Sequence, residues 1–368
     1  MLRDDPLLLR MIGLRHVADE ITLSAWLNGQ TEGSVKELRR LNSHFVNSAL
    51  QELCPAKTGN AANPIDVVMR TKRWDFCTAT NPIFGNIVAG DQLFWRTLAI
   101  GPFLLDGIWS ANPDTAKNTA QFEELVATHQ RSWKDYAAYF SSGDLPGAAA
   151  WRKVAGSDGC VSWTAQLDED IVRQACKFER ESKDLRWTDG DSSETKAHQY
   201  CLVHPVIDRP NILPAVAAVA RYREEGTMFY RWRFLAVPEK SDIPAQTLFA
   251  RHFSVNVVVD QMLDELNLNR MLSLESNARA AYFTIGLLAF NLLTALRLLL
   301  IPQAGNWTTR EMIRGIITTP ATLSSSGRRD TLRLAASSHW AADWRQDMNA
   351  SLSNLFAALK PHHARRKA

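Results

Sequence analysis

Two stretches of the chain mix basic and aromatic residues in a way that suits contact with nucleic acid. In RTKRWDF, Arg70, Lys72 and Arg73 come just before a tryptophan, and in RYREEGTMFYRWRF, Arg231 and Arg233 flank another tryptophan. Cationic side chains contact phosphates, and aromatic rings stack on bases. Ordinary packing of strands explains the aromatic rings equally well, so the pattern leaves both interpretations open.

A third stretch, RHFSVNVVVDQMLDELNLNR at residues 251–270, raises a question about a carboxylate. One polar side chain, Asn256, stands among valines, and the first acid, Asp260, follows four residues later. On a helix these two residues lie one turn apart on nearly the same face. The stretch is either a packed helix or a helix that has lost a functional acid.

Several other kinds of chemistry are not indicated by the sequence. It has no Walker motif, glycine-rich dinucleotide loop or nucleophile elbow, so nothing points to a nucleotide cofactor or to acyl transfer. The five cysteines are odd in number and form no CxxC pair. This usage favours reduced thiols in a cytoplasmic protein without disulfides.

Net charge alone does not identify a partner. The 42 Lys and Arg residues exceed the 39 Asp and Glu residues by only three, which is too little to indicate nucleic acid. Basic residues do gather toward the C-terminus, at Arg328, Arg329 and in the tail PHHARRKA. A polyanion would prefer this part of the chain, although solvated surface charge is the default interpretation.

The chain of 368 residues, 46% of them hydrophobic, is long enough for two modules. Hydrophobic periodicity predicts a helical N-terminal module in residues 1–60, with Thr22 and Ser34 as helix N-caps. Composition divides the remainder into a first strand-and-helix part, an insertion with one or two strands, helices that complete the core, and a C-terminal hairpin and helix with a basic tail. These parts are residues 61–182, 183–246, 247–302 and 303–368.

The order of elements within this division predicts an α+β fold. Strand patterns at residues 65–70, 91–100 and 103–111 are followed by a helix, a strand ending near Asp144, a second helix, a strand at 160–167 and a third helix. This is the order of a ribonuclease H-like mixed sheet flanked by helices. The apolar run 282–301 is about long enough to cross a bilayer, but Asn291 and Arg297 interrupt it, so we expect a buried core helix and no membrane contact.

Three longer segments then resemble a known family. NLNRMLSLESNARAAYFTIGLLAFNLLTALRLLLIP, TTREMIRGIITTPATLSSSGRRDTLRL and LRDDPLLLRMIGL are similar to segments of the DDE-type transposases of bacterial insertion sequences, DDE domain group 1. In that group a helical N-terminal part precedes a ribonuclease H-like domain that carries an insertion. The resemblance covers nearly the whole chain.

The resemblance implies an enzyme that binds double-stranded DNA and cuts or joins phosphodiesters. Two Asp and one Glu hold two Mg²⁺ ions about 3.5–4 Å apart, which activate the nucleophile and stabilise the leaving oxygen. Magnesium is the cofactor implied because it takes hard oxygen ligands.

Position by position, however, the expected acids are replaced. The first catalytic Asp falls on Val68, with only the neighbouring Asp66 retained, and the second falls on Asp144. The catalytic Glu falls on Asn256, which supplies no charge for a metal. The helix signature of Tyr, Arg, Glu and Lys corresponds to Phe249, His252, Asn256 and Leu263.

A displaced metal site made of Asp66, Asp144 and Asp260 is the alternative. Asp66 lies about 6–7 Å along a strand from Val68, and Asp260 lies one helical turn from Asn256. Catalytic geometry tolerates only about 1 Å of misplacement, so we expect instead that Asp66 is a strand-end surface acid and Asp144 a turn or helix-capping residue.

These observations predict a transposase-like DNA-binding protein that is catalytically degenerate or repurposed. The alternatives are an active transposase with Mg²⁺-dependent strand cleavage and transfer, and a protein-interaction scaffold without DNA binding. We expect a cytoplasmic, nucleoid-associated bacterial protein, with a homodimer as an open option. The predicted DNA contacts are Arg70, Lys72, Arg73, Arg231, Arg233, Arg328 and Arg329.

Overall fold

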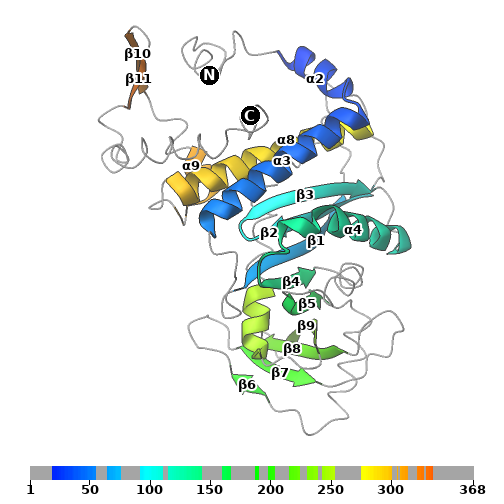
Figure 1. Cartoon of the computed structure of the whole chain (residues 1–368). Coiled ribbons are helices and arrows are strands. Elements are labelled where there is room, and N and C mark those ends of the chain that lie inside the picture. Colours follow the sequence, from blue (N-terminus) through cyan, green and yellow to red (C-terminus); the bar gives the residue numbers. More distant parts are fainter. Residues whose placement is uncertain are drawn as a thin grey trace, which may run out of the picture. The chain divides into compact units, whose positions relative to one another are not determined.

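The chain has an α+β fold, as predicted, and divides into two compact units (Figure 1). One unit contains residues 1–55 and 261–368, and the other contains residues 56–260. The finer division into five segments stays a prediction. The computed structural model describes residues 19–54, 64–75, 92–110, 115–142, 160–166, 187–189, 198–203, 215–223, 230–238, 243–252, 275–300, 305, 307–313, 321–326 and 329–334.

The first unit begins with two helices, α2 (Glu20–Asn28) and α3 (Glu32–Leu53). The Asp19 carboxylate accepts a hydrogen bond from the backbone N–H of Thr22 at 2.7 Å. Thr31 and Ser34 form a reciprocal capping box, in which each side chain accepts from the other's backbone N–H. The predicted N-caps, Thr22 and Ser34, are therefore wrong by one turn, because Asp19 and Thr31 already satisfy the free N–H groups.

Helix α3 packs against α8 (Ser276–Ala295), which continues as a π-helical turn, η3 (Leu296–Leu300) (Figure 1). Between the two helices the buried amide of Asn291 donates to the Asn42 carbonyl oxygen at 2.8 Å. A buried amide pair of this kind fixes the register of two otherwise apolar helices. The buried residues on α3 are Val35, Asn42, Phe45, Val46, Ala49 and Leu50.

By length and composition alone, the helix Ser276–Leu299 could cross a bilayer. Core helices of soluble proteins meet the same criterion. The described part of the chain contains one such helix, and the expectation of a core helix stays a prediction.

Two further small elements are described in the first unit. Helix α9 (Thr309–Met312) begins with a capping box between Thr308 and Glu311. Strands β10 (Ala321–Ser326) and β11 (Arg329–Leu334) pair antiparallel, which confirms the hairpin predicted from SSSGRRDTLRL.

In the second unit, nine strands of the described residues form one sheet in the order β3-β2-β1-β4-β5-β9-β8-β7-β6. Strands β3, β2 and β1 are antiparallel, β1, β4 and β5 are parallel, and β5, β9, β8, β7 and β6 are antiparallel. The strands are β1 (Ile65–Asp75), β2 (Gln92–Ile100), β3 (Phe103–Ser110), β4 (Ala138–Ser142), β5 (Cys160–Gln166), β6 (Thr188–Asp189), β7 (His198–Val203), β8 (Ala215–Arg223) and β9 (Tyr230–Pro238).

Helices cover the two faces of this sheet at different places. Helix α4 (Thr115–His129), followed by η2 (Gln130–Ser132), lies on the face of Arg96 and Asp106. Residues 245–252 are helical and cover the opposite face, where Leu248 and Phe249 pack among side chains of β4, β8 and β9. The register places Asp66, Val68 and Arg70 on this second face, because side chains alternate along a strand.

The insertion contains more strand than predicted. Four strands, β6 to β9, lie within it in the described residues, where the sequence predicts one or two. Strand β8 reads AVAAVARYR, and alanine is a weak strand former. Burial of Ala218 and Ala220 against the helix at residues 245–252 outweighs that weak propensity.

Candidate functional site

The candidate site lies on the helix-covered face of the three parallel strands. Val68 in β1 pairs with Ser141 in β4, and Ser141 pairs with Thr164 in β5. These three side chains therefore form a row at one level across neighbouring strands, and none of them is exposed by more than 2%. The sequence resemblance predicts the first catalytic Asp at Val68, in this row, but the row contains only neutral groups.

His252, on the helix at residues 245–252, covers this row of side chains. Its Nδ1 atom lies 2.8 Å from the Ser141 hydroxyl and 3.0 Å from the Thr164 hydroxyl. Burial, with a smaller effect from the Arg70 charge, lowers the pKa of His252 to about 4. The ring is thus neutral at physiological pH, and its Nδ1 can accept a hydrogen bond from a hydroxyl.

A serine beside a histidine could in principle act as a nucleophile and its base. Here Ser141 and His252 are each at most 1% exposed, and Thr164 is fully buried. No substrate can reach the serine in this arrangement. The cluster therefore joins the helix to the sheet and has no catalytic role that the geometry supports.

Two residues before Val68 on β1, Asp66 forms an ion pair with Arg251, and both side chains are about three-quarters buried. The Arg251 guanidinium also donates to the backbone carbonyl of Pro64 and lies over the Tyr139 ring, 4.5 Å from its centre. Burial raises the pKa of Asp66, although Arg251 favours its ionised form. Burial likewise raises the pKa of Tyr139 to about 12.

The described residues of this face do not by themselves make up a two-metal site. Mg²⁺ binds through carboxylate oxygens and retains several waters, whereas the one acid on this face in the described residues, Asp66, is already held by a guanidinium. A cation at that position also repels a divalent metal. Within the described residues, no group of three His, Cys, Asp or Glu side chains could hold a metal ion.

The other predicted site residues fall into two groups. Arg70 is half-buried on β1, while Arg231 and Arg233 are exposed on β9. Lys72 and Arg73 belong to β1, and Arg329 begins β11. Outside the described residues lie Asp144, Asn256, Asp260 and Arg328, so their proposed roles stay predictions.

Four arginines share the face on which Asp66 and Val68 lie. Arg231 and Arg233 alternate with Leu235, which packs under the helix at residues 245–252, so they belong to the same face as Arg70 and Arg251. Arg233 lies 5.5 Å from the centre of the Tyr222 ring. In the part of this face that the structure describes, arginines therefore outnumber acids.

Arg221 and Trp232, from the same stretch as Arg231 and Arg233, lie on the opposite face of the sheet. The Arg221 guanidinium lies 3.9 Å from the centre of the Trp187 ring and 5.8 Å from that of Trp232. Its Nε donates to Gln199 at 2.8 Å, and Gln199 donates to Asp189 at 2.9 Å. Arg221 is thus held by the sheet itself, in line with the strand-packing interpretation of these aromatic residues.

Sequence reasoning missed the residues that close the site. Tyr139, Ser141, Thr164 and Arg251 have no signature that marks them, although hydroxyls in the apolar strands AYFSS and CVSWTAQ are a weak signal of a buried polar partner. His252 was identified only as the replacement for the family's arginine.

A comparison with models of known protein families finds no match to this chain, and a comparison with curated proteins finds none either.

Proposed function

We propose that this chain is a transposase-like protein with a ribonuclease H-like core that binds double-stranded DNA and does not cut it. The strand order supports the proposal, because three antiparallel strands followed by two parallel ones is the arrangement expected of such a core. The extension by β6 to β9 agrees with the insertion expected in the same family.

The observation that carries the proposal is the charge of the helix-covered face. Among the described residues, this face combines Arg70, Arg231 and Arg233 with the ion pair of Arg251 and Asp66. The row of Val68, Ser141 and Thr164 is neutral and closed by His252. Positive charge attracts phosphates directly, and the absence of acids from this row removes the means to hold catalytic Mg²⁺ there.

Binding of a labelled duplex, followed by fluorescence anisotropy across salt concentrations, tests the proposal. Affinity should fall steeply as salt rises, because each phosphate contact contributes about 0.9 to the slope of log K against log salt. The affinity should be no higher in Mg²⁺ than in a chelator, because Mg²⁺ acts only as a competing counterion. A chain that binds no duplex at low salt would overturn the proposal and favour a scaffold that does not touch DNA.

Variants locate the DNA-binding surface. Arg231→Gln with Arg233→Gln should reduce the salt slope by about 2, one for each lost contact. Lys36→Gln is the matched control, because Lys36 is equally cationic and 68% exposed but lies on α3. The same loss of affinity for each charge removed in the control would mean that net charge, and not this face, determines binding. A protein of this kind would be cytoplasmic and associated with the bacterial nucleoid.

A further inference from the structure

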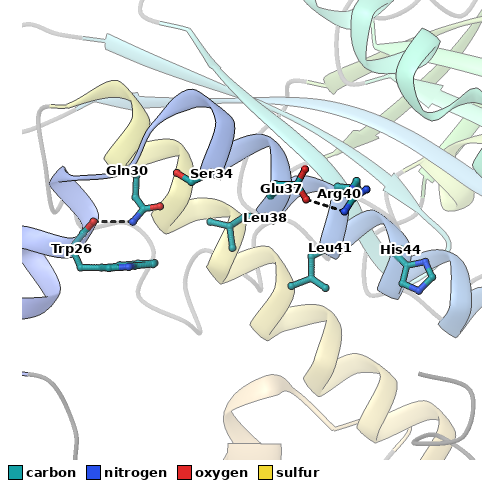
Figure 2. A pocket seen from close by; sticks show the side chains of 8 residues that line it. All are labelled: Trp26, Gln30, Ser34, Glu37, Leu38, Arg40, Leu41 and His44. Carbon is teal, nitrogen blue, oxygen red and sulfur yellow. Dashed lines mark hydrogen bonds and ion pairs between the residues drawn. The ribbon is translucent and has the colours of Figure 1, made fainter. Parts of the chain in front are cut away.

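We draw no further inference here: the strongest candidate, the groove along α2 and α3 that Trp26, Leu38 and Leu41 line (Figure 2), is an apolar surface, and nothing in the described part of the chain shows what covers it.

Discussion

The buried histidine makes the stability of the second unit depend on pH in a definite direction. The pKa of His252 falls from 6.5 to about 4 in the folded chain, so folding favours the neutral ring. This contribution is fully present above pH 6.5 and is lost as the pH falls toward 4, because the unfolded chain takes up a proton first. At about 1.4 kcal/mol per pKa unit, the full loss is about 3 kcal/mol, and about 2 kcal/mol is lost by pH 5.

Urea unfolding of the wild type and of His252→Asn, at about pH 7.5 and pH 5, measures this contribution. Asparagine places an amide oxygen near the position of Nδ1, so it can still accept from Ser141 or Thr164 but does not titrate. The free energy of unfolding of the wild type should fall by about 2 kcal/mol more than that of the variant. Asp66, whose raised pKa acts in the opposite direction, is present in both proteins and cancels in the comparison.

Two results would refute this reasoning. Equal pH dependence in the two proteins would mean that His252 is not kept neutral by burial. A His252 resonance that titrates near pH 6.5 in an NMR experiment would mean that the ring is exposed to solvent and that the Ser141 and Thr164 contacts do not persist.

Three further predictions concern packing. Gly107→Ala would place a Cβ atom 2.4 Å from Nε1 of the buried Trp95. It should therefore lower the free energy of unfolding by about 1–3 kcal/mol and change tryptophan fluorescence. Gly33→Ala is the control and should do neither, because the nearest atom to its new Cβ is 3.8 Å away. His129→Leu removes one partner of the buried Asp106 carboxylate, 2.6 Å away, and leaves the Gly107 backbone N–H that also donates to it. The variant should lower the free energy of unfolding by about 1–3 kcal/mol in thermal or urea unfolding. No measurable loss would show that the carboxylate does not depend on this pair. Asn42→Leu and Asn291→Leu should each destabilise the first unit by about 1–3 kcal/mol, while the double variant should lose less than the sum, and strict additivity would contradict a direct amide contact.

The central strands were predictable because their sequence carries strong signals. Branched and aromatic residues of IDVVMR, DQLFWRTLAI and FLLDGIWSA give β1 to β3, and turn residues separate them. The helical spacing in α3 was equally clear. Its start was misplaced because Thr31 and Ser34 are both good capping residues, and only the backbone shows which one stands outside the helix.

The candidate site was harder to predict because its contacts join residues far apart in the chain. His252 and Ser141 are separated by 111 positions, and Arg251 and Asp66 by 185. Local sequence carries no information about such pairs. The sequence did identify Asp66 and Val68 as neighbours on one face of a strand, but it predicted a surface acid where the structure has a largely buried ion pair.

One gel tests the central claim most directly. The full chain is mixed with supercoiled plasmid in Mg²⁺ or in a chelator, and each sample is run both intact and after removal of protein. The plasmid should be retarded in both intact samples and should return fully supercoiled once the protein is removed. Nicked or linear plasmid in the Mg²⁺ sample alone would contradict the account, because it would require a metal site that the Val68, Ser141 and Thr164 row does not supply.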